Sequence, residues 1–464
     1  AEMKKPVMSP RTSRAMEALS GKRALVVGLA LTGASSAKFL KRCGASVTAT
    51  DSKPISELSE AKGLAQMGVE VKAGGHCSVE PSSFDIVIVS PGVPFDIPLL
   101  KEARQGGVEV ISDIELAFRF IDAPVVAVAG TNGKTTTTAL LGKVLEDAGK
   151  KVFVGGNIGT PAVEYIEGDS RADLCVLEIS SFHLETTDTF NPHIGILLNI
   201  TEDHLDRYRD FDHYAETKFR LFENQRENDY AIVNMNDRVI AERAKKGFGK
   251  GKLVPFTVSG ALNEGLFLEG DSIAFINGTK KELYPTKGFR LKGLHNIENI
   301  MSVIAASRLS GVDREVILKT LSEFKGLSHR MEPVRELDGV QYIDDSKGTN
   351  IGALEMALRG LNAPVILIAG GRDKGGDYSA LSSLIKEKVR LMVLLGEARF
   401  KIKEALGDLT ETVLVDSLEE AVRLSRKKAS KGDVVLLCPA CSSFDMFKSY
   451  KERGERFKSF VEAL

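Results

Sequence analysis

The segment VVAVAGTNGKTTTT, from Val125 to Thr138, combines residue types that bind phosphate with the pattern of a strand, a Gly-rich turn and a helix. In such a turn the glycines let backbone N–H groups point inward, and the helix N-terminus adds a partial positive charge. Lys134 would neutralise phosphate, and Thr135 could reach Mg²⁺. The turn is shorter than the usual phosphate loop, because its two glycines enclose only two residues and Val128 stands where an earlier glycine is expected.

Two other polar residues follow apolar runs further along the chain. LCVLEIS places Glu178 at the end of one run, and ILLNITEDH places His204 just beyond the next. Ligands of open α/β sheets bind at the carboxyl ends of strands, so the shared position makes both residues candidates for a metal site. Mg²⁺ prefers oxygen ligands, which favours Glu178. Taken alone, Glu178 could equally form a salt bridge and His204 could be structural.

The composition limits the classes of partner. A chain of 464 residues is long enough for two to four domains. Lys and Arg total 62 against 63 Asp and Glu, which gives no general attraction for nucleic acid or an anionic membrane. No apolar run approaches the ~20 residues that span a bilayer, and the charged first segment has no apolar stretch behind it. Five cysteines do not form a disulfide framework in so long a chain, and we expect a cytoplasmic protein.

Strand and helix patterns alternate along most of the chain, which predicts an α/β fold. We expect three domains with boundaries near 114 and 327: 1–114 and 328–464, both Rossmann-like, and 115–327, an ATPase-like domain with a parallel sheet around the phosphate loop. In each unit the polar, Gly-rich segments follow the apolar strands, as in sheets that bind ligands at one edge.

VVGLALTG near the N-terminus is close to a dinucleotide fingerprint. It places Gly28, Ala30 and Gly33 at the turn, and Asp51 ends the next strand. A nicotinamide-dependent dehydrogenase is the competing interpretation, because it also uses an acidic strand end to bind ribose. The methyl group of Ala30 would stand where the backbone approaches a pyrophosphate, and a separate phosphate loop follows, so we favour a different nucleotide here.

CPAC has the spacing of a redox pair, with Cys438 and Cys441 as its thiols. The motif directly follows a buried strand. We therefore expect both thiols to pack in the core.

Seven motifs in the same order resemble those of the Mur ligase family over nearly the whole chain. They are GTNGKTT from Gly130, the Glu178 strand end, NITEDHLDR from Asn199, GLHNIEN from Gly293, HR at His329 and Arg330, DDSKGTN from Asp344, and CPACSSFD from Cys438. The short phosphate loop is the form that this family uses. The resemblance implies an ATP-dependent, amide-forming ligase with one domain each for a UDP-sugar, for ATP and for an amino acid.

The resemblance also implies a nucleotide and metal site. Its ATP residues would be Gly130, Thr131, Asn132, Gly133, Lys134, Thr135, Thr136, Asn296, Asn299, Arg330 and Asp345. Its metal ligands, for two magnesium ions, would be Thr135, Glu178, His204 and a carbamylated Lys218. The residues implied to take part in catalysis are Lys134, Lys218, His204 and Lys347. The carboxylate would attack the γ-phosphate, and an amine would then displace phosphate from the acyl phosphate.

Within the family, the last unit most resembles members that add D-glutamate to UDP-N-acetylmuramoyl-L-alanine during peptidoglycan precursor synthesis, a step in cell-wall growth that supports cell shape and division. By that resemblance the substrate residues are Leu31, Thr32, Asp51, Ser52, Asn157, Ser180, His183, Thr349, Lys374, Ser443, Phe444 and Tyr450. Three of these depart from the family pattern: His183 replaces a usual Gln, and Phe444 and Tyr450 replace Leu and Phe.

Three alternatives to this interpretation stay open. A phosphate-loop switch or motor usually has a full-length loop and a base-specificity motif, and neither is present in this sequence. A folate polyglutamate synthase would lack the UDP-type first unit. The diaminopimelate-adding relative usually has a DNPR segment, which this sequence lacks. We expect a monomer that binds only small molecules: ATP, the UDP-sugar and D-glutamate.

Overall fold

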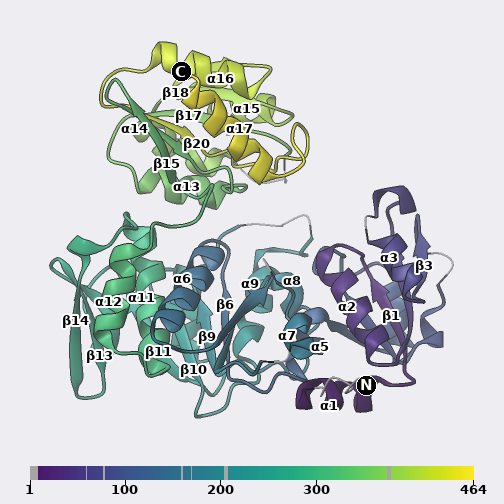
Figure 1. Cartoon of the computed structure of the whole chain (residues 1–464). Helices are drawn as coiled ribbons and strands as arrows, with labels where there is room; N and C mark the ends of the chain where they lie inside the picture. Colours follow the sequence, from purple (N-terminus) through teal and green to yellow (C-terminus); the bar gives the residue numbers. More distant parts are fainter. Residues whose placement is uncertain are drawn as a thin grey trace, which may run out of the picture.

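The computed structural model describes residues 9–58, 60–76, 79–157, 160–168, 170–202, 207–373 and 378–464. Its strands form three sheets of five, nine and six strands. Each sheet with its helices is one unit in Figure 1, with the central unit between the other two. This arrangement confirms the predicted three-part α/β fold. Two predicted site residues, His204 and Lys374, lie outside the described residues.

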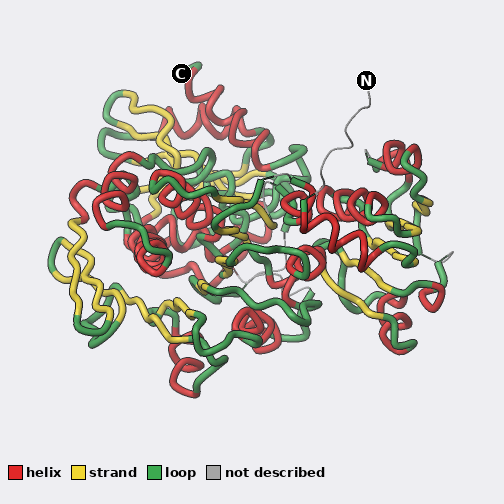
Figure 2. The backbone as a smooth tube through the Cα atoms, turned by 60° about the horizontal axis from the view of Figure 1, so that its bottom comes forward, coloured by secondary structure: helices red, strands yellow, loops and turns green. Residues whose placement is uncertain are grey.

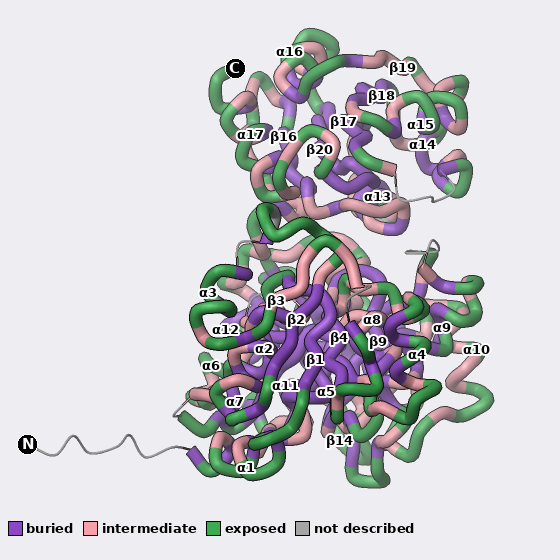
Figure 3. The backbone as a smooth tube through the Cα atoms, turned by 90° about the vertical axis from the view of Figure 1, so that its right-hand side faces the viewer, coloured by how far each residue is buried: buried purple, intermediate pink, exposed green. Residues whose placement is uncertain are grey.

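The N-terminal unit is a parallel sheet in the order β3-β2-β1-β4-β5. Its strands are β1 (Arg23–Val27), β2 (Ser46–Asp51), β3 (Glu70–Ala73), β4 (Ile86–Val89) and β5 (Glu109–Ser112). Its helices are α1 (Pro10–Leu19), α2 (Leu31–Arg42), α3 (Ala61–Gln66), α4 (Pro98–Gln105) and α5 (Asp113–Phe118). The apolar runs that predicted β1 and β4 are buried on both faces, as expected for a parallel sheet covered by helices (Figure 3).

Helix α1 precedes the first sheet but also binds the central unit. The Arg11 guanidinium donates to the carbonyl oxygens of Gly168 and Ser170 at 2.6 and 3.1 Å. Apolar side chains of α1 belong to a hydrophobic cluster that continues from the first sheet into the central unit. The first two units therefore share one core.

The central unit has the strand order β14-β13-β12-β11-β10-β9-β6-β8-β7. Its strands are β6 (Val125–Ala129), β7 (Val152–Gly156), β8 (Leu174–Glu178), β9 (Ile194–Leu197), β10 (Tyr230–Asn234), β11 (Lys252–Thr257), β12 (Gly265–Glu269), β13 (Ser272–Asn277) and β14 (Lys280–Pro285). Its helices are α6 (Lys134–Asp147), α7 (Val163–Glu167), α8 (Ser181–Leu184), α9 (Phe211–Phe219), α10 (Arg238–Lys246), α11 (Leu294–Leu309) and α12 (Arg314–Glu323).

One edge of this sheet differs from the prediction of a parallel sheet. β12 pairs antiparallel with β13, and β13 with β14. These strands are joined by tight turns at Gly270 and Gly278, both with positive φ, which a parallel connection would not need. They form the long strands at the left-hand edge of Figure 2.

The C-terminal unit has the strand order β15-β16-β20-β17-β18-β19. Its strands are β15 (Glu332–Leu337), β16 (Val340–Asp344), β17 (Val365–Gly370), β18 (Val389–Leu395), β19 (Glu411–Leu414) and β20 (Val434–Leu437). Its helices are α13 (Ile351–Arg359), α14 (Ser382–Lys388), α15 (Arg399–Leu406), α16 (Leu418–Lys428) and α17 (Tyr450–Glu462). Alternate residues of β17 belong to two hydrophobic clusters, so both faces of the sheet are covered.

Short 3₁₀ turns complete the fold: η1 (Ile55–Glu57), η2 (Pro81–Ser83), η3 (Arg220–Phe222), η4 (Thr286–Gly288) and η5 (Tyr378–Leu381). Across the described ranges, no helix combines the length and the apolar character needed to cross a bilayer. The cysteines at 43, 175, 438 and 441 are buried free thiols. The expectation that the chain has no disulfide framework holds for these four.

Candidate active site

The phosphate loop connects β6 to α6, and its glycines are required by the backbone. Gly130 and Gly133 have φ of 149° and 84°, in the region that side chains disfavour. A Cβ on Gly133 would lie 2.5 Å from Oδ1 of Asn299, so this residue lets the loop approach α11 closely. The Lys134 ammonium folds back over the loop and donates to the carbonyl oxygens of Gly130 and Thr131 at 2.9 and 2.8 Å.

Asn199, two residues after the end of β9, holds the loop in place. Its carbonyl oxygen accepts the Thr131 N–H at 2.9 Å, and its Oδ1 accepts the Asn132 N–H at 2.7 Å. Its own amide donates to the Asn132 carbonyl at 3.1 Å. Asn199 was not among the predicted site residues, although it follows an apolar run as Glu178 does; that β9 lies beside β6 is visible only in the fold.

Helix α9 presents two residues to the other side of the loop. The Tyr214 hydroxyl lies 3.0 Å from Oγ1 of Thr131. Lys218 is 2% exposed, and its Nζ donates to the Gly130 carbonyl at 3.0 Å. The ammonium also lies 4.7 Å from the centre of the Tyr214 ring. The spacing of four residues places both side chains on one face of α9, so Lys218 reaches the phosphate loop.

Glu178 ends β8, the neighbour of β6, and is 2% exposed. Its carbonyl oxygen accepts the Asn157 N–H at 2.9 Å, and its Oε1 lies 3.4 Å from the Asn157 amide nitrogen. Glu178 is also one of the charges that act on Lys347 of the C-terminal unit. The predicted carboxylate therefore lies at the ligand-binding edge of the sheet.

Lys347 reaches from the C-terminal unit to the phosphate loop. Its Nζ donates to Oγ1 of Thr135 at 2.8 Å and lies 5.5 Å from the centre of the Tyr450 ring. Burial, followed by repulsion from Arg330, lowers the pKa of Lys347 to about 7. These cations are half-buried, and like charges brought together with little water around them are costly unless an anion neutralises them, so this arrangement suits a polyphosphate.

One pocket between the central and C-terminal units collects most of the predicted ATP residues. Those that line it are Asn132, Gly133, Thr136, Asn296, Asn299, Arg330 and Asp345, and Lys347, predicted to take part in catalysis, lines it too. Three exposed cations that were not predicted from the sequence line it as well: Arg290, Lys292 and Lys325. No motif marks them, and only the fold brings their loops to this pocket.

Asp345 lies at the wall of this pocket with both carboxylate oxygens bonded to the protein. Oδ1 accepts the Met331 N–H at 3.1 Å, and Oδ2 accepts the thiol of Cys438 at 3.2 Å. Burial raises the pKa of Asp345 to about 6. The second thiol of CPAC, Cys441, lies 3.1 Å from the Tyr378 hydroxyl. Both thiols are buried, which confirms the prediction that they pack in the core.

A second pocket opens on the N-terminal unit beside the dinucleotide-like turn. The predicted residues Leu31, Thr32, Asp51, Ser52 and Asn157 all line it. The Asp51 carboxylate accepts the backbone N–H groups of Leu29 and Lys53 at 2.7 and 2.9 Å, so it organises the turn itself. Because Asn157 also contacts Glu178, this pocket extends toward the phosphate loop.

His183 is fully buried and occupies a chain of hydrogen-bonding groups. Its Nδ1 accepts the Ser180 N–H at 3.1 Å and lies 3.0 Å from the Ser180 hydroxyl. Its Nε2 lies 3.3 Å from Oδ1 of Asp113. Neither this Nε2 nor this Oδ1 makes a hydrogen bond among the described residues, so the His183 ring is held mainly through Ser180.

The predicted amino-acid residues that the structure describes, Thr349, Ser443, Phe444 and Tyr450, follow β16 and β20 in the C-terminal unit but differ in exposure. Ser443 is 2% exposed and follows β20, whereas Phe444 is 63% exposed. The Thr349 N–H donates to the Lys347 carbonyl at 2.9 Å. Their role around one ligand stays a prediction.

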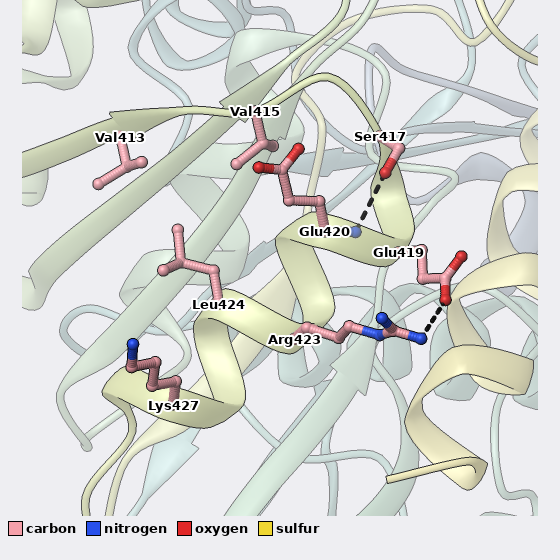
Figure 4. A pocket seen from close by; sticks show the side chains of 8 residues that line it. All are labelled: Val413, Val415, Ser417, Glu419, Glu420, Arg423, Leu424 and Lys427. Atoms are coloured by element: carbon pink, nitrogen blue, oxygen red, sulfur yellow. Dashed lines mark hydrogen bonds and ion pairs between the residues drawn. The ribbon is translucent and has the colours of Figure 1, made fainter.

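A separate hollow lies between β19 and α16, remote from these residues. It is lined by Val413, Val415, Ser417, Glu419, Glu420, Arg423, Leu424 and Lys427 (Figure 4). Two of its charged side chains, Glu419 and Arg423, pair with each other at 2.6 Å. It shares no lining residue with either pocket described above.

Among the described residues, one group has the composition and closeness of a metal site: His329, Glu332 and Asp344. It includes none of the predicted magnesium ligands. His329 Nδ1 is 2.7 Å from Oδ2 of Asp344, and Lys458 pairs with Glu332 at 2.9 Å. The first pair joins the connection between the last two units to the end of β16, and the second joins α17 to the start of β15.

Comparison with known proteins agrees with this site. The chain matches the MurD-like N-terminal domain of Mur ligases over residues 22–112, the Mur ligase middle domain over 128–307 and the Mur ligase glutamate ligase domain over 329–441. The chain belongs to the Mur ligase family, whose members form amide bonds at the expense of ATP. The predicted family and class of enzyme are therefore confirmed.

Two curated relatives are both named UDP-N-acetylmuramoylalanine–D-glutamate ligase. The protein from Geobacter metallireducens is 48% identical over 447 residues, which cover 96% of this chain and 98% of the relative. The protein from Geotalea uraniireducens is 49% identical over 450 residues, with the same coverage of 96% and 98%.

More distant solved structures share the fold. A MurF ligase from Thermotoga maritima in complex with ADP has 17% identity and a TM-score of 0.60, covering 98% of this chain and 99% of that one. A pseudomurein peptide ligase type C from Methanothermus fervidus has 19% identity and the same score of 0.60, covering 96% and 100%.

Proposed function

We propose that this protein adds D-glutamate to UDP-N-acetylmuramoyl-L-alanine in an ATP-dependent reaction of peptidoglycan precursor synthesis. The contact between Lys347 and the phosphate loop carries the mechanistic part of the proposal, because it joins the ATP and amino-acid units at one point. The names of relatives that match 96% of this chain support the choice of substrates.

In this reaction the chain's own residues would act mainly by position and charge. Lys134 of the phosphate loop and Lys347 of the C-terminal unit would stabilise the charge that develops as the γ-phosphate moves to the substrate carboxylate. Asn296, Asn299, Arg330 and Asp345 would bind the nucleotide. Leu31, Thr32, Asp51 and Ser52 would bind the uridine end of the first substrate, with Asn157, Ser180 and His183 toward its other end.

Magnesium fits the donors at this edge of the sheet. The Glu178 carboxylate and the Thr135 hydroxyl offer oxygen atoms, which Mg²⁺ prefers, beside cations that already need a polyanion. When bound, Mg²⁺ would neutralise phosphate charge. We propose two ions, with His204 and Lys218 as the other ligands.

Lys218 becomes a metal ligand in this proposal only after carbamylation, in which its neutral amine adds CO₂ and releases a proton. Its buried position against the Gly130 carbonyl supports the proposal, because a carbamate oxygen there would lie next to the phosphate loop. Intact-protein mass spectrometry and ¹³C NMR with labelled bicarbonate test it. Partial rescue of Lys218→Ala by a short carboxylate is expected, and an unmodified lysine in fully active enzyme contradicts it.

Thr349, Lys374, Ser443, Phe444 and Tyr450 form the proposed D-glutamate site. Lys374→Ala should raise the KM for D-glutamate far more than the KM for either other substrate.

The reaction itself is tested by an assay of phosphate release with ATP, UDP-N-acetylmuramoyl-L-alanine and a panel of amino acids. We expect turnover only with all three substrates and a strong preference for D-glutamate over L-glutamate. Lys134→Ala should lose at least ~100-fold in rate, because a charge that acts on the transition state contributes several kcal/mol. Equal use of L-glutamate, or an unaffected folded Lys134→Ala variant, contradicts the proposal.

We also propose a cytoplasmic monomer with domain boundaries near 114 and 327. The buried free thiols support a reducing compartment. The gaps between the last strand of each sheet and the first strand of the next, Ser112 to Val125 and Pro285 to Glu332, include both boundaries. Light scattering and limited proteolysis test these two points.

A further inference from the structure

Arg453 lies in the first turns of α17 and is 3% exposed. Its guanidinium makes four hydrogen bonds to neutral oxygen atoms. Nε donates to the Ser346 hydroxyl at 3.0 Å, and Nη2 donates to the Ser346 carbonyl at 2.9 Å. Nη2 also donates to the Cys441 carbonyl, and Nη1 to the Ser442 carbonyl, both at 3.2 Å. One side chain therefore binds two separate loops.

The two loops carry the residues proposed to bind the amino acid. Ser346 lies between Asp345 and Lys347 in the segment that follows β16, and Ser442 directly precedes Ser443 in the segment that follows β20. β16 and β20 are neighbours in the sheet. A third segment follows β17, on the other side of β20, and there a Cβ on Gly371 would lie 3.2 Å from Nη1 of Arg453. The guanidinium thus lies where the carboxyl ends of three adjacent strands meet.

The geometry requires arginine in particular. Its planar fork offers several N–H donors in fixed directions, so it can bind four oxygen atoms on two loops at once, whereas a lysine ammonium is a point charge on a flexible stem. Burial lowers the pKa of Arg453 to about 10, so the group stays charged at neutral pH. A fixed positive charge at the base of these loops also favours binding of an anion above them.

We propose that Arg453 is a positioning residue for the amino-acid substrate: by joining the Ser346 and Ser442 segments it sets the distance between Lys347 and Ser443, and its charge attracts the two carboxylates of the substrate. This inference rests on the proposed function, because it takes D-glutamate as the ligand of these loops. Arg453 acts through its neighbours and does not itself contact the reacting atoms.

Steady-state kinetics of Arg453→Lys, with each of the three substrates varied in turn, test the inference. Lysine keeps the charge but lacks the planar guanidinium and its several N–H donors. Because several buried hydrogen bonds from a charged group are lost, the KM for D-glutamate should rise about tenfold or more. The KM for the UDP-sugar should stay within about twofold, because that pocket lies on another unit. Arg335→Lys is the matched control, because Arg335 also donates to backbone carbonyls, of Val461 and Glu462, but away from the loops.

A second variant keeps the test decisive if Arg453→Lys does not fold. Ser346→Ala removes the hydroxyl that accepts from Nε and donates to the Tyr450 carbonyl at 2.7 Å, but it leaves the bond from Nη2 to the Ser346 carbonyl, so a smaller rise in the same KM is expected in the folded variant. A D-glutamate KM equal to that of the unaltered enzyme in Ser346→Ala and in any folded Arg453→Lys overturns the inference. So does a rise of equal size in all three KM values. If the proposed function is wrong, the unaltered enzyme itself will not use D-glutamate, which is a different result.

Discussion

ATP binding should cause Lys347 to take up a proton. Burial and repulsion from Arg330 and Lys134 lower the pKa of this lysine from 10.5 to about 7, although Glu178 opposes the shift. The negative charge of phosphate groups beside Lys347 would offset the repulsion from Arg330 and Lys134 and would favour the charged form of the lysine. The pKa of Lys347 should therefore rise toward its ordinary value in the nucleotide complex. At any pH where Lys347 is neutral in the free enzyme and charged in the complex, ATP binding must be accompanied by uptake of a proton.

The size of the effect follows from the shift. A group with a pKa of about 7 carries roughly a tenth of a proton at pH 8, so ATP binding should take up about 0.9 proton per site at that pH, and only about 0.1 at pH 6. A difference of about 3.5 units corresponds to an upper bound of ~5 kcal/mol between the two protonation states. The unfolded chain, with the higher pKa, binds more protons between about pH 7 and 10.5. This group's contribution to the free energy of unfolding therefore increases as pH rises through that window.

Calorimetry measures the uptake directly. A non-hydrolysable ATP analogue with magnesium is titrated into the enzyme at pH 6 and pH 8 in buffers with different enthalpies of ionisation. The slope of binding enthalpy against buffer enthalpy gives the number of protons taken up. Lys347→Met is the control, because it keeps much of the buried side chain but has no titrating group.

Binding of the analogue to the wild-type enzyme at pH 8 without proton uptake would contradict a role for Lys347 as the group that gains the proton, and so would equal uptake by Lys347→Met. Equal uptake would assign the proton to the nucleotide or to another residue. A weaker affinity of Lys347→Met with unchanged uptake would show that Lys347 contacts phosphate but is already charged.

Two further changes test contacts around the same pocket. Cys438→Ala removes the thiol that donates to Oδ2 of Asp345, so urea unfolding should show a free energy of unfolding lower by about 1–3 kcal/mol. Cys438→Ser keeps a donor and should lose less. Equal losses in the two variants would contradict a role for this hydrogen bond. Gly352→Ala places a Cβ 2.8 Å from Oγ1 of Thr201 and 3.0 Å from Nδ2 of Asn132, where α13 meets the phosphate loop. Overpacking of this kind costs about 1–3 kcal/mol, so both the thermal midpoint and kcat should fall. Gly63→Ala, at a helical glycine with open space around it, is the control. An equal effect of this control on kcat would contradict a role for the contact between α13 and the phosphate loop.

The parts of this site that depend on local backbone geometry could be predicted from the sequence. The phosphate loop needs its glycines because Gly130 and Gly133 adopt positive φ at the end of an apolar strand, and both features are visible in VVAVAGTNGKT. The Asp51 strand end could be recognised in the same way. Such residues can be identified from the local sequence, because their neighbours in the sequence are also their neighbours in space.

Other parts depend on which strands and helices lie side by side, and no local pattern records this. Asn199 supports the loop only because β9 pairs with β6, which are more than 60 residues apart in the chain. The antiparallel edge of the central sheet was missed because its strands have the same short apolar runs as parallel ones. Their direction is set by the turns between them.

The role that we propose for Arg453 also depends on which elements the fold brings together and could not be predicted from the local sequence. In the sequence it is one charged residue in YKERGERF, a pattern typical of an exposed helix, and nothing nearby suggests burial. Its role arises because the first turns of α17 lie over the carboxyl ends of β16 and β20, where two loops leave carbonyl groups that need donors. A helix with an ordinary polar sequence can thus hold an active site together, since the donors that buried carbonyls require can come from any element that the fold places beside them.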